Sequence, residues 1–193
     1  SLEACFSQLS MHEKLNILFR VHDNPFWEYM AGRGRRNFHL RLIPRKQVKD
    51  FLHFLSTGHT GLIAADHALS KRRGVFVPFF GIQASPVTSV SDFCRQTNSI
   101  AMLVSGYRRV GAGSTVEIRP PIENFPSDDV VADTARVSLL TEQAIREQPG
   151  DYLWHHRRFK TRPEGEPSLY ERQKKRKSNK RRLQKQRDKE NLK

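Results

Sequence analysis

Residues 40–65, LRLIPRKQVKDFLHFLSTGHTGLIAA, place a helical pattern between two short apolar runs. The first run, residues 40–43, is strand-like and ends at a proline. Four apolar residues then recur at the i, i+3, i+4, i+7 spacing of one helix face: Val48, Phe51, Leu52 and Leu55. Gly58 and Gly61 bracket the turn into the second run, residues 62–65. This order of strand, helix and strand is typical of an α/β fold built on parallel strands.

The same alternation continues on both sides of this stretch. We expect further strands at residues 17–21, 75–80, 100–105 and 115–119, the last two joined by a hairpin turn at residues 111–113. We expect further helices at residues 25–30, at residues 87–94 and from about Asp128 to a stop at Pro149-Gly150. The pattern therefore predicts a twisted, largely parallel central sheet with flanking helices.

The polar carboxyl end divides the chain into two parts. Of the net charge of +14, residues 171–193 carry +9, because they hold 12 Lys/Arg against 3 Asp/Glu. We therefore expect one domain at residues 1–170 and a basic tail at 171–193 that is either disordered or a solvated helix. The tail either adheres to anionic lipid or only keeps the chain soluble. A charge of this sign favours anionic partners, namely nucleic acid, phosphorylated lipid or a membrane surface.

Residues 152–163, YLWHHRRFKTRP, interleave aromatic and basic side chains directly after the expected helix stop. Such a segment can hold several phosphate or carboxylate oxygens while its rings lie against apolar surface. The candidates for binding an acidic substrate are Trp154, Arg157, Arg158 and Lys160. The alternative is a surface loop whose rings pack and whose charges are solvated.

Two further places carry candidate site residues. Arg33 and Arg35 alternate with Gly32 and Gly34 after a short expected helix, and glycines let a backbone approach a ligand closely. A solvated turn or an RNA-binding patch is the alternative. His67 follows Asp66 at an expected strand end, where α/β folds place ligands, so it is a candidate substrate contact. The two cysteines and eight histidines form no zinc-type pair, so no metal is expected.

Several of these blocks, taken in order, resemble the lipid A biosynthesis acyltransferases, which add lauroyl or myristoyl chains to a Kdo-bearing lipid A precursor. The resemblance covers residues 1–170. Residues 152–163 resemble the closing signature of that family, residues 32–35 its Arg-Gly-Arg block and residues 76–80 its Phe-Ala-Pro-Phe-Phe segment. Residues 64–67 stand where the family usually has Pro-Asp-Gln-Asp, with Ala68 in place of the second aspartate.

The resemblance implies a glycerolipid-acyltransferase-like fold and an O-acyltransferase that uses acyl carrier protein as donor and no cofactor. The chemistry of the family rests on a His-x-x-x-x-Glu/Asp motif, in which the histidine removes a proton from the acceptor hydroxyl and the carboxylate orients the histidine. Residues 1–3 resemble the end of that motif, so Glu3 is the expected carboxylate. The histidine of the motif would precede Ser1, so we expect this chain to be an inactive C-terminal fragment.

The resemblance also assigns roles to the other candidates. Arg33 and Arg35 would stabilise the thioester oxyanion or bind acceptor phosphate. Asp66 would shape the active site, although Ala68 leaves acceptor binding in that block open. The expected location is the cytoplasmic face of the inner membrane, with an anchor upstream. The expected partners are acyl carrier protein, the lipid A precursor and the membrane surface, and nucleic acid is not expected.

Two rival functions stay open at this point. A nucleic-acid-binding module would use the basic tail and residues 33–36, and it predicts base-stacking aromatics on an exposed sheet. An inactive relative kept as a scaffold would fit the alanine at position 68.

Overall fold

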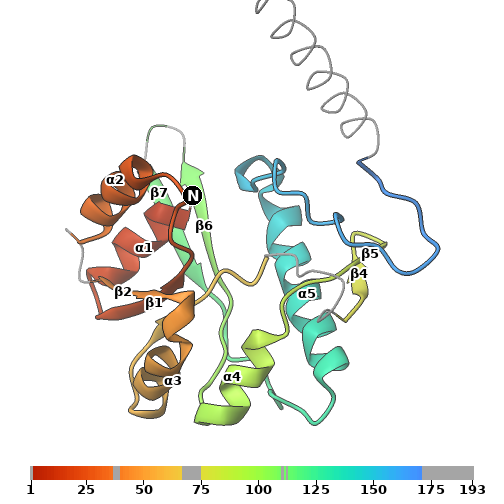
Figure 1. The fold of residues 1–193 in the computed structure, drawn as a ribbon, viewed down its shortest axis with the longest axis horizontal. Coiled ribbons are helices and arrows are strands. Elements are labelled where there is room, and N and C mark those ends of the chain that lie inside the picture. Colours follow the sequence, from red (N-terminus) through yellow and green to blue (C-terminus); the bar gives the residue numbers. More distant parts are fainter. Residues whose placement is uncertain (1, 37–39, 67–74, 110, 112, 171–193) are drawn as a thin grey trace, which may run out of the picture.

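A three-stranded parallel sheet lies at the centre of the amino-terminal half of the chain (Figure 1). The computed structural model describes residues 2–36, 40–66, 75–109, 111 and 113–170. The sheet order is β2-β1-β3, with β1 at Leu15–Phe19, β2 at Leu40–Pro44 and β3 at Gly61–Leu62. In its register Ile17 lies opposite Leu42 on one side and Leu62 on the other. The predicted α/β fold with parallel strands is confirmed.

Helices connect and flank these strands. They are α1 at Leu2–Ser10, α2 at Pro25–Arg36 and α3 at Val48–Ser56, with a short 3-10 helix η1 at Arg45–Gln47 before α3. Leu15, Ile17, Ile43 and Phe51 are all buried, because β1 has a neighbouring strand on each side and α3 packs against it. The i, i+3, i+4, i+7 pattern of residues 48–55 therefore identified α3 and its core-facing residue Phe51.

Gly61 is required by a close approach between β3 and α3. A Cβ atom at Gly61 would lie 2.6 Å from Cζ of Phe51 and 2.7 Å from Cδ2 of Leu55. The Phe51 ring is fully buried, so it has no free space into which to move. Gly34 in α2 has no atom within 4 Å of the corresponding position.

Two alanine substitutions should therefore have opposite effects on stability. Gly61→Ala should lower the free energy of unfolding by about 1–3 kcal/mol, because the added methyl group overpacks the contact with Phe51. Gly34→Ala, the matched control, should raise it by about 0.5–1 kcal/mol, because alanine favours a helix interior. Urea unfolding of both variants measures the difference. Equal stability of the Gly61→Ala protein and the parent would contradict the close approach.

The remaining strands form two antiparallel hairpins outside the central sheet. One pairs β4 at Val77–Phe79 with β5 at Ile82–Ala84, and the other pairs β6 at Val104–Arg109 with β7 at Gly113–Ile118. The expected strand at residues 75–80 is too long, because Phe80 and Gly81, both with positive φ, form the two-residue turn. The hairpin expected around residues 111–113 is confirmed, although β6 begins four residues after the predicted start at Ile100.

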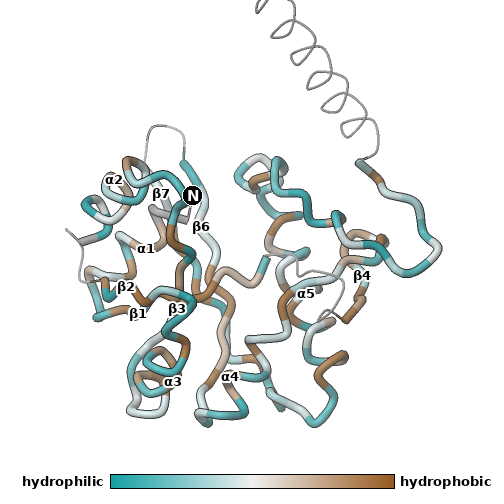
Figure 2. Tube along the Cα trace, viewed as in Figure 1, coloured by the Kyte–Doolittle hydropathy of each residue, from teal (hydrophilic) through white to brown (hydrophobic). Residues whose placement is uncertain are grey.

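The carboxyl-terminal half is organised around the long helix α5, Val130–Glu147. Helix α4, Ser89–Thr97, packs against both α3 and α5, and the 3-10 helix η2 at Pro149–Asp151 follows α5. Phe79, Ala84 and Ile145 form a buried cluster between the β4–β5 hairpin and α5, against which Phe80, Tyr152 and Phe159 pack. Figure 2 shows the apolar segments of β1, β4 and α5. None of the helices that the structure describes is both long and apolar enough to cross a bilayer.

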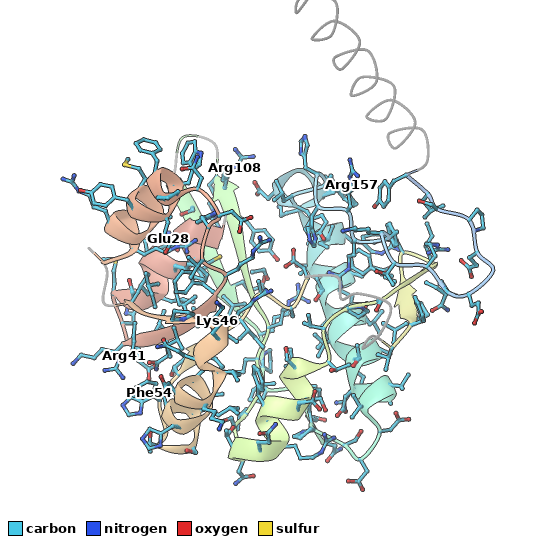
Figure 3. The ribbon with its side chains drawn as sticks, in the orientation of Figure 1. Glu28, Arg41, Lys46, Phe54, Arg108 and Arg157 are labelled. Carbon is cyan, nitrogen blue, oxygen red and sulfur yellow. The ribbon has the colours of Figure 1, made fainter. Side chains whose placement is uncertain are left out.

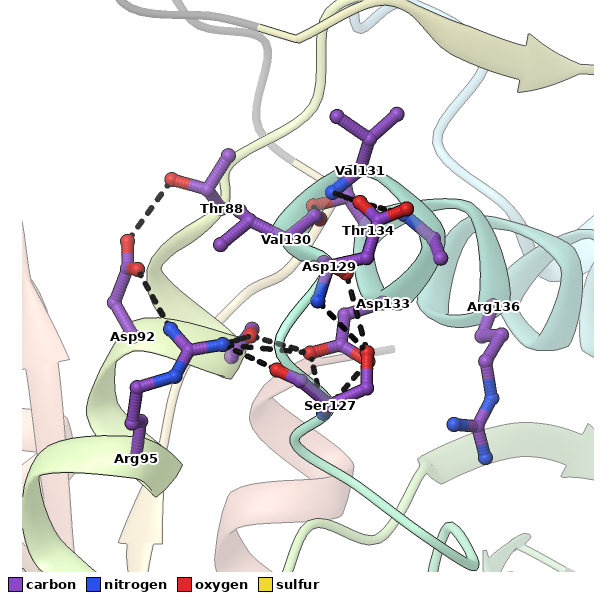
Figure 4. A network of polar contacts seen from close by, with 12 residues as sticks. Thr88, Asp92, Arg95, Ser127, Asp129, Val130, Val131, Asp133, Thr134 and Arg136 are labelled. Atoms are coloured by element: carbon purple, nitrogen blue, oxygen red, sulfur yellow. Dashed lines mark hydrogen bonds and ion pairs between the residues drawn. The ribbon is translucent and has the colours of Figure 1, made fainter.

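A buried carboxylate fixes the start of α5 (Figure 4). Asp129 caps the helix by accepting hydrogen bonds from the backbone N–H groups of Val131 at 2.8 Å and Ala132 at 3.1 Å. Asp133, which has no exposed surface, accepts from the Ser91 hydroxyl at 2.6 Å and from Ser127 through both N–H and hydroxyl. Burial alone would raise the pKa of Asp133, but these hydrogen bonds outweigh it and hold the pKa below its usual value.

Acid should therefore destabilise the protein through this network. Because the folded-state pKa of Asp133 is lowered, its contribution is fully present above the unfolded pKa and is lost as pH falls through the folded pKa. Asp133→Asn should lower the free energy of unfolding at pH 7 by about 1–3 kcal/mol. Asparagine replaces one accepting carboxylate oxygen by an NH2 group, which is itself a donor and would face the donor groups of Ser91 and Ser127. The substitution should also flatten the dependence of stability on pH below about pH 4. Urea titrations between neutral and acid pH test this, and an unchanged pH dependence in Asp133→Asn would exclude Asp133 as its source.

Candidate functional site

Helix α1, which carries Glu3, lies against the β6–β7 hairpin. The Gln8 side-chain amide donates to the Ser114 carbonyl oxygen at 2.9 Å and contacts its hydroxyl at 2.7 Å. Figure 1 shows the amino-terminal end of α1 beside this hairpin. The backbone of Glu3 belongs to α1, but its side chain lies outside the described part of the structure.

The other side of the same hairpin is bound to the end of α5 by ion pairs. Arg119 donates to both oxygens of Glu147, at 2.6 and 2.5 Å, and the Tyr107 hydroxyl donates to Glu147 at 3.2 Å. Arg108 contacts Asp151 through its side chain at 2.8 Å and through its backbone N–H at 2.9 Å. Hydrogen bonds from Arg119 and Arg108 hold the pKa values of these two carboxyls below their usual range. The hairpin thus contacts both the helix of Glu3 and η2, which directly precedes residues 152–163.

Arg33 and Arg35 lie inside helix α2, not after it. The expected helix at residues 25–30 was too short, because α2 continues to Arg36 through both glycines. Residues two apart on a helix do not share a face. Arg33 is exposed, whereas Arg35 is half-buried on the face that also holds the buried Gly32. The two arginines therefore cannot act as a pair on one group.

The charges of both Asp66 and Arg158 act on the hydroxyl of Tyr152. Burial raises the pKa of Tyr152, the positive charge of Arg158 lowers it, and the negative charge of Asp66 raises it further. Arg158 is only 3% exposed and stacks over the ring of Phe79 at 4.1 Å from its centroid. The sequence pattern did not single out Tyr152, although it opens the aromatic and basic segment.

The other members of that segment have different surroundings. Trp154 is exposed, donates its indole N–H to the Pro149 carbonyl oxygen at 2.8 Å and packs edge-on against Tyr152. Arg157 is half-buried and lies over the ring of Tyr170, while Lys160 is exposed. Of the four substrate-binding residues predicted in this segment, Trp154, Arg157 and Lys160 are thus at least partly exposed, whereas Arg158 is buried. His67 and Ala68 lie outside the described residues.

Cysteine and metal chemistry find no support in the part of the chain that the structure describes. Cys5 and Cys94 are free and buried, and burial raises the pKa of both thiols. Within the described ranges, no group of three or more His, Cys, Asp or Glu side chains is placed to hold a metal ion. Among the residues whose placement the structure describes, the exposed aromatic side chains lie on α2 and at Trp154, not on the central sheet as a nucleic-acid-binding sheet would require.

Comparison with known proteins gives the family. The chain is 31% identical over 172 residues to the lipid A biosynthesis lauroyltransferase of Escherichia coli (strain K12), an alignment of 88% of this chain and 56% of the relative. It is 31% identical over 167 residues to a lipid A biosynthesis acyltransferase of Haemophilus influenzae, covering 84% of this chain and 54% of the relative. It is 24% identical over 165 residues to the lipid A biosynthesis myristoyltransferase of E. coli, covering 84% of this chain and 51% of the relative.

The chain therefore spans about half the length of the curated relatives it matches. The model of the family described as "Bacterial lipid A biosynthesis acyltransferase" matches residues 1–161. This range includes the helices and strands that the structure describes. The matched region contains α1, Arg33 and Arg35 of α2 and the segment up to Thr161. On this match the chain belongs to the bacterial lipid A biosynthesis acyltransferase family.

Proposed function

We propose that this chain is part of an enzyme that transfers a fatty acyl group from acyl carrier protein to a hydroxyl of a Kdo-bearing lipid A precursor. The observation that carries the proposal is the family match over residues 1–161, together with 31% identity to a lauroyltransferase. The enzyme acts at the cytoplasmic face of the inner membrane. The same hairpin contacts the helix of Glu3 and Asp151, which directly precedes the aromatic and basic segment, and this supports one site formed from both.

The proposed reaction is a direct acyl transfer. A histidine that precedes Ser1, oriented by Glu3, takes the proton of the acceptor hydroxyl as its oxygen attacks the thioester carbonyl carbon. A C–O bond forms, the C–S bond breaks, and the histidine returns the proton to the thiolate of the carrier. Of the two arginines, Arg35 stabilises the oxyanion, because it lies on the inner face of α2.

We assign the remaining candidates to the acceptor. Lipid A precursors are acidic, and charge-assisted hydrogen bonds to such groups contribute about 1.5–3 kcal/mol each. Lys160 and Trp154 are exposed and can reach a ligand directly, with Arg157 beside them. Asp66, whose charge acts on the hydroxyl of Tyr152, helps to shape the site. His67 is proposed as a further contact.

Lipid A from living cells tests the proposal. The protein used is the chain extended at its amino end to the length of its relatives, referred to below as the longer protein. It is expressed in a Gram-negative strain that lacks its own late acyltransferases. The molecular mass of the extracted lipid A is then measured by mass spectrometry. We expect a gain of one acyl chain. An unchanged mass in cells that contain the folded protein would contradict transfer to lipid A and would favour the inactive scaffold.

A further inference from the structure

The outward face of α2 is apolar, which is the reverse of an ordinary surface helix. Phe26, Tyr29, Met30 and Arg33 follow the i, i+3, i+4, i+7 spacing that normally faces a protein core. Here the first three are 61%, 55% and 48% exposed, and the neighbouring Trp27 is 61% exposed. We call these four apolar residues the aromatic face.

The inward side of the same helix carries the polar residues. Glu28, Gly32 and Arg35 have the same spacing on the opposite side and are buried or half-buried. The Glu28 carboxylate accepts a hydrogen bond from the backbone N–H of His22 at 2.8 Å, and α2 packs against β2. Figure 3 shows Glu28 on the inner side of α2 and aromatic side chains on its outer side. The exposure of the aromatic face therefore follows from how α2 is oriented on the sheet.

Charges at the end and to the side of this face indicate what covers it. Arg33 continues the aromatic face by one turn and is exposed. Arg108, on the β6 strand, and Arg157 lie along the same edge of the molecule in Figure 3. Without the basic tail, residues 1–170 still carry a net charge of +5, which is the +14 of the chain less the +9 of residues 171–193. Aromatic side chains next to arginines on one helix face fit the boundary of an anionic bilayer, where rings enter the headgroup layer and cations meet phosphates.

We propose that the aromatic face of α2 docks the protein onto an anionic lipid surface, with Arg33 at the rim of the contact. Docking by this face is distinct from adhesion by the basic tail, which needs no apolar insertion. It also needs no turnover. Failure of docking and failure of the proposed acyl transfer are therefore separate results.

Tryptophan fluorescence tests the docking of the aromatic face directly. The sequence has two tryptophans, so the full chain with Trp154→Phe reports on Trp27 alone. Vesicles of phosphatidylglycerol and phosphatidylcholine with brominated acyl chains should shift Trp27 emission to the blue and quench it. Vesicles of phosphatidylcholine alone should bind less strongly, because they do not attract the cations. Sedimentation with the anionic vesicles without any quenching would mean that the tail alone binds, and would overturn the proposal.

A second set of variants tests whether binding depends on the aromatic face itself or on exposed apolar residues in general. Phe26→Ser, Trp27→Ser and Met30→Ser together should weaken binding to anionic vesicles at least about tenfold, because they remove apolar surface that the bilayer would bury. The matched control is Val131→Ser with Leu139→Ser, two exposed apolar residues of α5, and it should bind like the parent. Salt at about 0.5 M screens the tail and should leave this difference visible. Equal binding by both variants would overturn the proposal.

Two further outcomes would indicate that something other than lipid covers the aromatic face. A blue shift of Trp27 that grows with protein concentration in the absence of lipid would assign the face to a second copy of the chain. A Trp27 that brominated lipid quenches in this chain but not in the longer protein would assign the face to another protein segment. Either result would contradict docking on lipid.

Discussion

Glu3→Gln in the longer protein should reduce acyl transfer by about a thousandfold or more, while thermal stability stays close to that of the parent. The proposed role of Glu3 is to hold a histidine in the orientation and tautomer that accept a proton, and glutamine offers neither the charge nor the correct hydrogen bond. The loss should appear in kcat and in kcat/KM, because the interaction matters most in the transition state.

Glu13→Gln is the matched control for this change, because Glu13 is exposed just after α1. It should leave turnover unchanged. Full activity of the Glu3→Gln enzyme would remove Glu3 from the mechanism. A parallel loss of folding and activity would show that Glu3 supports α1 and does not act on the base.

Arg35→Lys should cost about 10²–10³-fold in kcat, whereas Arg33→Lys should leave turnover of a detergent-dispersed acceptor near the parent value. The reason is the geometry of α2, which directs Arg35 toward the body of the protein and Arg33 toward solvent. Lysine keeps the positive charge but not the planar guanidinium that can give two parallel hydrogen bonds. Steady-state kinetics on both variants measure the difference. The reverse order of effects would place the acceptor on the outer side of α2.

The fold was largely predictable because its central elements have strong periodicity. The apolar residues from Val48 to Leu55 have the spacing of one helix face, so they predicted a helix with one buried side, and α3 buries Phe51. Strand limits were less predictable, since they depend on pairing. β1 occupies residues 15–19 and not 17–21, because its pairing with β2 begins at Leu15, while Val21 is exposed beyond the last pair. Likewise, the two-residue turn at Phe80 and Gly81 ends β4 early.

The candidate site was less predictable than the fold. The sequence pattern places the Arg-Gly-Arg block after a short helix, with glycines that let the backbone approach a ligand. In the structure the arginines and the packing on β2 keep α2 helical to Arg36, which separates the two arginines onto opposite faces. The burial of Arg158 depends on the β4–β5 hairpin beneath it, which lies some seventy residues earlier in the sequence. No local pattern distinguishes it from its neighbour Arg157.

The exposed face of α2 was missed for a related reason. The spacing of Phe26, Tyr29, Met30 and Arg33 is that of an ordinary helix face, and such a stripe usually faces a core. Only the orientation of α2 on β2, with Glu28 inward, shows that the stripe faces outward. Periodicity predicts that a helix has two faces but does not say which one the protein covers.

One in vitro measurement tests the central claim most directly. The longer protein is mixed with acyl carrier protein loaded with a fatty acid and with a purified Kdo-bearing lipid A precursor. Loss of the thioester and gain of an ester on the precursor are followed together by mass spectrometry. The account predicts that one ester forms for each thioester lost, and that Glu3→Gln abolishes both. Release of free fatty acid without any ester on the precursor would contradict it.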